Sequence, residues 1–343
     1  METKILKIEN PEDKRLSEMG EIIRNGGLVS FPTETVYGLG ANAFDKNAAL
    51  KVFEAKNRPC DNPLIVHIND ISELDEIACD IPEGAVKLFR EFSPGPLTII
   101  LKKKDIIPDE VTAGLNSVAV RIPSHPIARA FIKAAGVPIA APSSNLSGRP
   151  SPTKAEHVIF DMNGRIDAII DGGASSVGVE STVIELTDEG INILRPGGIT
   201  KKDLERVYNS VSVDRHVTEM VSDGETPKSP GTKYKHYAPE AEVTVIEGDK
   251  KATFEEIKRL IKEEKDIPIG VMCYDGFAFD SETLLYMGEG NEQYAERLFD
   301  SLRQFDILGI KKVYAQFEDD DEYGMAVKNR LFKAAAGRVL HIE

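Results

Sequence analysis

The segment GLVSFPTETVYGLG, residues 27–40, passes from a short apolar run into a polar loop that is closed by glycines. A short apolar run bounded by turn residues is typical of a buried β-strand. Residues 16–24 before it and residues 48–55 after it have apolar side chains at helical spacing. Because helix-like and strand-like segments alternate in this way, we predict an α/β fold with a polar loop at the end of a buried strand.

The same alternation continues through the first two thirds of the chain. The strand-like runs that follow are 63–68, 97–101, 118–122, 138–141, 168–170, 182–186 and 191–194. The last two flank Thr187-Asp188-Glu189-Gly190, which predicts a hairpin, and the sheet is therefore expected to be mixed.

The C-terminal third repeats a strand–helix–strand rhythm of its own, which predicts a smaller Rossmann-like domain with a parallel sheet. The segments are 243–246, 254–262, 267–274, 294–308, 312–317 and 325–337. Gly288-Glu289-Gly290 lacks the remainder of a dinucleotide-binding fingerprint, so we interpret it as a turn.

A length of 343 residues predicts two domains. Apolar periodicity stops near residue 211, and the next 29 residues contain three prolines. We predict a first domain over 1–210, a linker over 211–240 and the Rossmann-like domain over 241–343. The linker's centre, SPGTKYKHY at 229–237, is basic and aromatic. It is either a plain tether or a segment that closes over the first domain.

The net charge of −15 disfavours broad coating of nucleic acid, which needs an excess of Lys and Arg. Residues 241–343 carry 14 basic against 22 acidic side chains, and residues 1–240 carry 28 against 35. A basic cleft in the nearly balanced first part therefore remains open. No apolar run reaches the ~20 residues that span a bilayer, and the N-terminus lacks a secretory pattern, so we expect a cytoplasmic protein that does not engage a membrane.

Three cysteines, Cys60, Cys79 and Cys273, are odd in number and show no CxxC spacing. Neither a disulfide framework nor a zinc site is indicated, and we expect buried free thiols. Motifs of P-loop NTPases, zincins and common serine hydrolases do not occur in the sequence.

Two short motifs follow predicted elements and carry groups suited to phosphate. Lys56-Asn57-Arg58 comes at the end of a helical pattern, where two cations can bind a triphosphate or can simply complement the helix dipole. Ser143-Ser144-Asn145 follows an apolar strand, where hydroxyl and amide groups can contact phosphate or ribose or can form a local turn.

Charged and polar residues also occur within the strands. Arg121 lies in the apolar run 118–122 and needs a carboxylate partner, from the protein or from an amino-acid ligand. His67 lies in a strand, where a hydrogen-bonded structural role is the ordinary alternative to ligand binding. Ser181 and Arg195 stand at the two ends of the predicted hairpin, where turn chemistry or surface pairing would also suffice.

Eight segments in order resemble the YrdC-like threonylcarbamoyl-AMP synthase family along residues 15–205. They are FPTETVYGLG, KNRP, NPLIVHI, SPGPLT, AVRIP, APSSNLSG, GVESTVI and ILRPG. The later SPGTKYKHYAP and the acidic tail resemble the long form of the family, which has an appended C-terminal domain. The resemblance implies a twisted mixed sheet with helices in the first domain.

The resemblance also implies an activity. Family members are nucleotidyltransferases that condense L-threonine, bicarbonate or CO₂, and ATP into threonylcarbamoyl-AMP and pyrophosphate. Mg²⁺ would accompany ATP, mainly through its phosphates, and the protein ligands of the metal remain unknown. The product would pass to the threonylcarbamoyltransferase complex that modifies adenosine 37 of tRNA.

By the same resemblance, individual residues receive roles. Threonine would be held by Thr35, His67, Arg121 and Ser181. ATP would be surrounded by Lys56, Arg58, Asn62, Ser117, Ser143, Asn145, Ser151, Arg195 and Tyr234. Lys56 and Arg58 would also be catalytic, and Tyr234 would bring the linker over the nucleotide.

Three other interpretations stay open. Weak binding of double-stranded RNA is one, although the acidity and the absence of RNA-binding signatures weigh against it as the main activity. Carbamoyl transfer through a carbamoyl-adenylate, as in the related domain of hydrogenase-maturation proteins, is the second. In the third, the C-terminal domain is an interaction element only.

Overall fold

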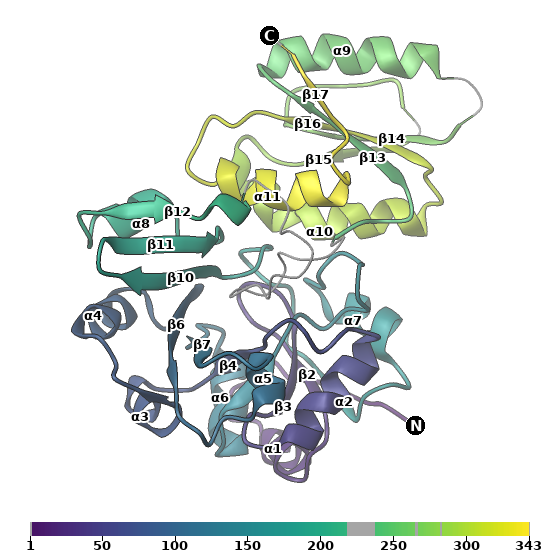
Figure 1. The fold of residues 1–343 in the computed structure, drawn as a ribbon. Coiled ribbons are helices and arrows are strands. Elements are labelled where there is room, and N and C mark those ends of the chain that lie inside the picture. Colours follow the sequence, from purple (N-terminus) through teal and green to yellow (C-terminus); the bar gives the residue numbers. More distant parts are fainter. Residues whose placement is uncertain (1, 218–236, 265–266, 282, 343) are drawn as a thin grey trace. The chain divides into compact units, whose positions relative to one another are not determined.

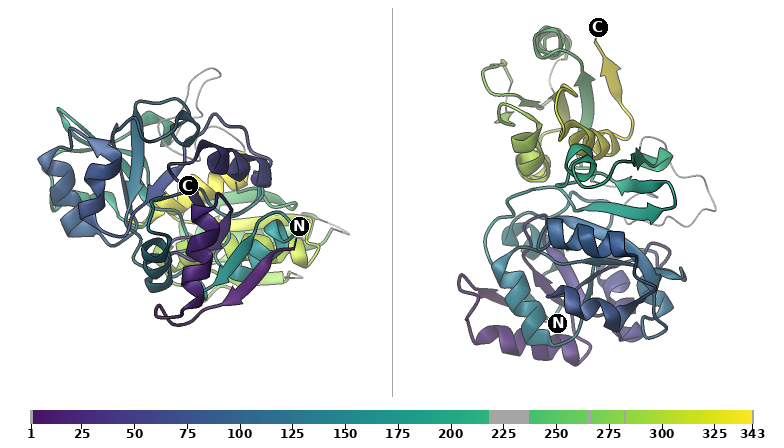
Figure 2. Two further views of the ribbon diagram at one scale, coloured as in Figure 1. Left: turned by 90° about the horizontal axis from the view of Figure 1, so that it is seen from below. Right: turned by 90° about the vertical axis from the view of Figure 1, so that its left-hand side faces the viewer.

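The computed structural model describes residues 2–217, 237–264, 267–281 and 283–342. It divides into two compact units. Unit 1 comprises residues 1–147, 152–176 and 180–233, and unit 2 comprises residues 148–151, 177–179 and 234–343, apart from the residues outside the described ranges. Both can be followed by colour, purple to teal for most of unit 1 and green to yellow for most of unit 2 (Figures 1 and 2).

Unit 1 is built on a 12-stranded mixed sheet with the order β1-β9-β2-β3-β8-β4-β7-β6-β10-β11-β12, and β5 pairs with β6. Its strands are β1 (Lys4–Lys7), β2 (Val29–Phe31), β3 (Gly38–Asn42), β4 (Ile65–His67), β5 (Ala78–Cys79), β6 (Leu97–Lys103), β7 (Ser117–Arg121), β8 (Ile139–Ala141), β9 (Ala168–Asp171), β10 (Thr182–Thr187), β11 (Gly190–Arg195) and β12 (Val211–Val213). The predicted hairpin is confirmed, because β10 and β11 pair antiparallel around Thr187 and Gly190.

Helices and 3-10 turns connect these strands. They are α1 (Arg15–Arg24), α2 (Lys46–Lys56), η1 (Ile71–Glu73), α3 (Leu74–Ile77), α4 (Glu83–Phe92), α5 (Asp109–Thr112), α6 (Pro126–Ala135), α7 (Ala155–Met162), α8 (Lys201–Glu205) and η2 (Arg215–Val217). The fold class predicted for this part of the chain, a twisted mixed sheet with helices, is confirmed.

Two hydrophobic clusters make up the core of unit 1. One joins α1 and α6 to β2 and β9 and includes Met19, Phe31 and Phe131. The other joins α2 and α4 to the central strands and includes Phe53 and Val120. A strand that is buried on both faces reads as a continuous apolar run rather than an alternating one, which is why β7 and β8 were predictable from the sequence.

Helices α1 and α6 pack very closely at Gly20. A Cβ atom built there would lie 2.5 Å from the carbonyl oxygen of Ala134, well inside van der Waals contact. Only glycine allows this approach. The contact fixes both helices beside the strand β2, which leads into the polar loop at residues 32–37.

Unit 2 contains a five-stranded sheet with the order β15-β14-β16-β13-β17, in which every pairing is parallel. Its elements are β13 (Glu242–Glu247), α9 (Lys250–Glu263), β14 (Ile269–Cys273), β15 (Thr283–Tyr286), α10 (Asn291–Ile307), β16 (Lys312–Phe317), α11 (Gly324–Ala334) and β17 (Val339–His341). The predicted Rossmann-like architecture is confirmed. The edge strands β15 and β17 were not predicted, because they are short and partly exposed and so lack a continuous apolar run.

Two details differ from the sequence-based expectations: the start of the linker and the burial of the cysteines. Strand β12 pairs in parallel with β11, so ordered structure of unit 1 continues past residue 210, where the sequence predicted a linker. Most of that linker lies outside the described residues.

Of the cysteines, Cys273 is buried and burial raises the pKa of its thiol to about 12, but Cys79 is half-buried and Cys60 is exposed. The expectation of buried thiols is therefore wrong for Cys60, which follows the end of α2 in a loop.

The close packing of the α1–α6 layer predicts a large cost for an emptied core position. Phe131 is fully buried, with its ring centroid 5.4 Å from that of Phe31. We expect Phe131→Ala to lower the free energy of unfolding by about 3–5 kcal/mol, because it leaves a cavity. Denaturant unfolding measures this, with the half-exposed Ile106→Ala as a control that should change little. Equal effects of the two substitutions would contradict the assignment of this core.

Candidate functional site

Three adjacent strands carry polar side chains in one row across the sheet. His67 of β4 is paired with Arg121 of β7, and Arg121 is paired with Thr98 of β6. Directly paired residues point to the same face of a sheet. The register therefore places an imidazole, a guanidinium and a hydroxyl side by side on one face.

Arg121 is the centre of this row and is only 4% exposed. Its Nη2 donates to Glu34 Oε1 at 2.7 Å, its Nη1 donates to Thr35 Oγ1 at 2.8 Å, and its Nε approaches the Gly95 carbonyl oxygen at 3.4 Å. The carboxylate that the sequence required is thus supplied by the protein. Among the described residues, one N–H on each terminal nitrogen has no acceptor, and two such donors can hold a second carboxylate.

The polar loop after β2 holds Arg121 from one side. The second oxygen of Glu34 accepts from the backbone N–H of Ser124 at 3.1 Å. The hydroxyl of Thr33 donates to the Val36 carbonyl oxygen and lies 2.8 Å from Thr35 Oγ1. Because the single Thr33 proton is already used, Thr35 donates to Thr33 and accepts from Arg121.

His67 is buried and its environment keeps it uncharged. Desolvation, aided by the nearby positive charge of Arg121, lowers the pKa of His67 to about 3. Its Nδ1 lies 3.1 Å from the Ile65 carbonyl oxygen, and its ring packs edge-on against Phe31. A neutral imidazole can face a substrate without adding charge.

Ser181 joins the row from the neighbouring strand pair. Its Oγ lies 2.8 Å from Thr98 Oγ1 and accepts from Arg195 Nη2 at 3.1 Å. Arg195 also donates through Nε and Nη2 to the Ser181 carbonyl oxygen, at 3.1 and 3.0 Å. The structure therefore brings together the four residues predicted for threonine. It also places with them Arg195, which was predicted to contact ATP.

Lys56 ends helix α2 and is 2% exposed. Its ammonium donates to the carbonyl oxygens of Ser143 and Asn145, the latter at 2.5 Å. The Ser143 hydroxyl donates to Asn145 Oδ1 at 2.6 Å. The two motifs expected to handle phosphate thus lie together, and Lys56 is a buried cation that holds the Ser143–Asn145 loop rather than a surface charge at a helix end.

Helix α2 is stopped so that its last residues turn toward this loop. Asp45 caps its N-terminus, and Asn57 adopts a left-handed conformation at φ 52° that ends it. Arg58 then packs over the Phe53 ring at 5.7 Å and donates to the Asn62 carbonyl oxygen at 3.1 Å. The Asn62 amide is fully buried, and neither its oxygen nor its nitrogen has a hydrogen-bond partner in the described part of the chain. Such a group commonly awaits a ligand or water.

The polar loop at 32–37 connects the two groups of residues. It holds Arg121 through Glu34 and Thr35, while the Tyr37 carbonyl oxygen accepts from the Ser144 N–H at 2.8 Å and Gly38 forms a bridge with Ser143. One loop therefore sets the separation between the Arg121 cluster and the loop held by Lys56.

Three further residues were predicted for the nucleotide. Ser117 is half-buried at the opposite end of β7 from Arg121, about 13 Å away along the strand. Ser151 is buried within the segment 148–151, which belongs to unit 2. Tyr234 lies outside the described residues.

Sequence reasoning missed Glu34, Gly95 and Thr98. Glu34 was quoted as part of a motif but received no role, although a single acid among small and apolar residues is a signal that a buried cation could explain. Gly95 and Thr98 contribute a carbonyl and a neutral hydroxyl, which carry no distinctive signal in a sequence.

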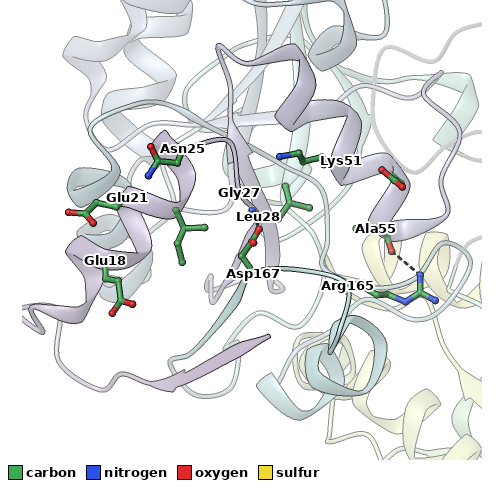
Figure 3. A pocket seen from close by; sticks show the side chains of 11 residues that line it. Glu18, Glu21, Asn25, Gly27, Leu28, Lys51, Ala55, Arg165 and Asp167 are labelled. Atoms are coloured by element: carbon green, nitrogen blue, oxygen red, sulfur yellow. Dashed lines mark hydrogen bonds between the residues drawn. The ribbon is translucent and has the colours of Figure 1, made fainter. Parts of the chain in front are cut away.

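A separate hollow lies near the start of β2, away from the row. It has a volume of about 740 Å³, and its lining residues include Lys51, Arg165 and Asp167 (Figure 3). Lys51 donates to the Gly26 carbonyl oxygen, Arg165 donates to that of Ala55, and Asp167 accepts from the Leu28 N–H. These groups bind the surrounding backbone, and none of the predicted site residues lines this hollow.

The described helices include none that is both long enough and apolar enough to cross a membrane.

Fold and site together define a two-domain α/β protein whose first domain holds buried cations and hydroxyls in two groups that are connected by one loop. Residues 21–197 match the family model described as "Telomere recombination", and residues 199–336 match that of the threonylcarbamoyl-AMP synthase C-terminal domain. The chain belongs to the threonylcarbamoyl-AMP synthase family, in its long form.

Individual relatives agree over nearly the whole chain. The threonylcarbamoyl-AMP synthases of Pyrococcus abyssi and Bacillus subtilis are 44% and 46% identical to it, over 97% and 96% of this chain and 98% and 95% of theirs. The solved structure of P. abyssi Sua5 complexed with L-threonine superposes with a TM-score of 0.95 at 44% identity, covering 99% of this chain and all of that one. The family and fold expected from the sequence are confirmed.

The burial of His67 predicts a specific dependence of stability on pH. The folded ring has a pKa of about 3, against about 6.5 when unfolded, so its contribution is complete above pH 6.5 and is lost as the pH falls toward 3. From pH 7 to pH 5, we expect the free energy of unfolding to fall by about 2 kcal/mol less in His67→Gln than in the wild type. Denaturation of both proteins across this pH range measures the difference, and an unchanged slope in His67→Gln would contradict the assignment.

Proposed function

We propose that this protein is an L-threonylcarbamoyladenylate synthase that condenses L-threonine, bicarbonate or CO₂, and ATP into threonylcarbamoyl-AMP and pyrophosphate. The observation that carries the proposal is the Arg121 cluster, in a chain 44–46% identical over nearly its full length to named synthases. A buried guanidinium with two N–H groups left over fits an amino-acid carboxylate.

In this proposal threonine lies over the row of His67, Arg121 and Thr98. Its carboxylate takes the two remaining N–H groups of Arg121, and Thr35, His67 and Ser181 surround the rest. The P. abyssi relative was solved in complex with L-threonine, and its similarity over nearly the whole chain supports a threonine site in this protein. Neutral His67 leaves Glu34 and Arg121 as a balanced pair, so the pocket can accept a zwitterion before it reacts.

ATP is assigned to the adjoining group, with Arg58, Asn62, Ser143, Asn145 and Lys56 nearest to the phosphates. Ser117, Ser151, Arg195 and Tyr234 complete the proposed set. Support comes from the buried amide of Asn62, which has no hydrogen-bond partner among the described residues, and from the contact of Lys56 with the Ser143–Asn145 loop.

Mg²⁺ is proposed to enter with the phosphates of ATP. The nucleotide set contains amides, hydroxyls and cations but no carboxylate, which is the protein group that Mg²⁺ prefers. The metal would supply charge neutralisation on the phosphates.

The reaction needs proximity and charge neutralisation more than a protein nucleophile. The threonine amine adds to CO₂ and loses a proton, which gives an N-carboxylate. An oxygen of that carboxylate attacks the α-phosphorus of ATP, a P–O bond forms, and the bond to pyrophosphate breaks. Two anions must meet, and Arg121, Lys56 and Arg58 lower the cost of bringing them together.

The product is a mixed anhydride and hydrolyses readily in water. We propose that it passes to a threonylcarbamoyltransferase complex that modifies adenosine 37 of tRNA, in the cytoplasm. The competing carbamoyl-transfer interpretation differs in substrate, since it would require carbamoyl phosphate and not threonine. RNA binding as the main activity would show as affinity that falls steeply with salt and does not depend on ATP or threonine.

Substrate dependence tests the function directly. The purified chain is incubated with ATP, labelled bicarbonate and each amino acid in turn, and labelled nucleotide adducts are separated. We expect an adduct and stoichiometric pyrophosphate with threonine, and neither without bicarbonate. Pyrophosphate release that requires carbamoyl phosphate, or none with any amino acid, would contradict the proposal.

Loss of the positive charge of Lys56 or of Arg58 should slow adenylate formation. We expect Lys56→Ala or Arg58→Ala to reduce the rate of threonine-dependent pyrophosphate release by about 10²- to 10³-fold, as for one preorganised charge-stabilising group. Lys51→Ala, on the same helix but in the separate hollow, is the matched control and should retain near wild-type rates. Near-normal release in either motif variant would refute its role.

A further inference from the structure

Two buried hydroxyls in the site leave one proton without an acceptor. Thr98 is 0% and Ser181 1% exposed, and their oxygens lie 2.8 Å apart. Each hydroxyl has one proton. In the described part of the chain, Thr98 has no other side-chain partner, and the only other partner of the Ser181 hydroxyl is the Arg195 guanidinium, which can only donate. One proton bonds the pair together, and no group of the described residues receives the second.

The surroundings indicate which hydroxyl keeps that second proton. Arg195 already donates to Ser181 Oγ at 3.1 Å. If Thr98 donates as well, both lone pairs of Ser181 are filled and its own proton must point away from both partners. A hydroxyl whose oxygen accepts from a cation is also polarised into a stronger donor.

The opposite direction of the hydrogen bond between Thr98 and Ser181 is less favourable. If Ser181 donated to Thr98, the free proton would sit on Thr98, whose oxygen accepts from no cation in the described part of the chain and which is therefore the less polarised donor. Ser181 instead comes just before β10, where the chain enters the strand. A free proton on Ser181 is therefore better placed to reach a ligand.

We propose that Thr98 is a positioning residue: it donates to Ser181 and thereby fixes Ser181 as a hydrogen-bond donor to a carboxylate oxygen of the substrate. This inference rests on the proposed function and gives it a further residue. Thr98 is paired with Arg121 across the strands, so the donor is aimed at the same site as the Arg121 N–H groups. The carboxylate is either that of the amino acid or the N-carboxylate that forms on it.

The test uses Thr98→Val, which keeps the shape but removes the hydroxyl, and Thr98→Ser, which keeps the hydroxyl. We expect Thr98→Val to raise the KM for threonine about 5- to 10-fold, the effect of one weakened hydrogen bond, and to leave the KM for ATP within about twofold. Thr98→Ser should restore the wild-type value. Thermal unfolding checks each variant, and Thr98→Ala takes the place of Thr98→Val if the latter does not fold.

A double-mutant cycle with Ser181→Ala separates positioning from general packing. The Thr98→Val effect should vanish in the Ser181→Ala background, and Ser181→Ala alone should cost at least as much as Thr98→Val. Multiplicative effects, a larger cost for Thr98→Val, a Thr98→Val enzyme with wild-type KM, or a Thr98→Ser enzyme as weak as Thr98→Val would each overturn the proposal.

Two further readouts complete the experiment. Calorimetric titration of threonine without bicarbonate shows whether the amino-acid carboxylate is the acceptor, because Thr98→Val then weakens binding itself; an effect confined to turnover assigns the N-carboxylate instead. A normal KM for threonine in Ser181→Ala would refute the assignment of Ser181 in the proposed function. A raised KM in Ser181→Ala with no effect of Thr98→Val would refute only the role of Thr98.

Discussion

The buried ion pair between Arg121 and Glu34 is the interaction on which the site depends. A guanidinium that is 4% exposed cannot be neutralised by water, so its charge requires a carboxylate at hydrogen-bond distance. Removing one partner of such a pair typically costs about 3–5 kcal/mol, because the other charge stays buried alone. Glu34 therefore keeps Arg121 in place when no substrate is bound, and a bound carboxylate can use the N–H groups that Glu34 and Thr35 leave over.

Sheet register then determines which groups surround that pair. His67, Arg121 and Thr98 share one row across β4, β7 and β6, and a slip of one residue in any strand would turn its side chain to the opposite face. The loop at 32–37 contacts both this row and the Ser143–Asn145 loop that Lys56 holds. A rigid sheet and one short loop thus set the spacing between the row around Arg121 and the Ser143–Asn145 loop. This fixed spacing suits the proposed reaction, in which two anions must be brought into contact.

Much of the fold and of the site could be predicted from the sequence, and the remaining features could not, for identifiable physical reasons. The central strands are apolar runs, and Arg121 is conspicuous as a charge inside one of them. Both the fold class and the importance of this buried charge could therefore be predicted. Thr98 was not, because a threonine in a strand is ordinary until its cross-strand partner is known. Lys56 was placed in the right motif, but a sequence cannot show that its ammonium turns back onto carbonyl oxygens of a loop 87 residues away. The ligand-binding roles of all the predicted site residues, including Ser117, Ser151 and Tyr234, stay predictions.

The most direct measurement of the central claim is calorimetric titration of L-threonine into a variant in which the pair is neutralised as a whole, Glu34→Gln with Arg121→Gln. Replacing both partners avoids a lone buried charge, so the fold is retained while the carboxylate anchor is lost. The account predicts threonine affinity at least about 100-fold below that of the wild type, the loss of two charge-assisted hydrogen bonds, with binding of a non-hydrolysable ATP analogue unchanged. Wild-type affinity for threonine in the folded double variant would contradict it.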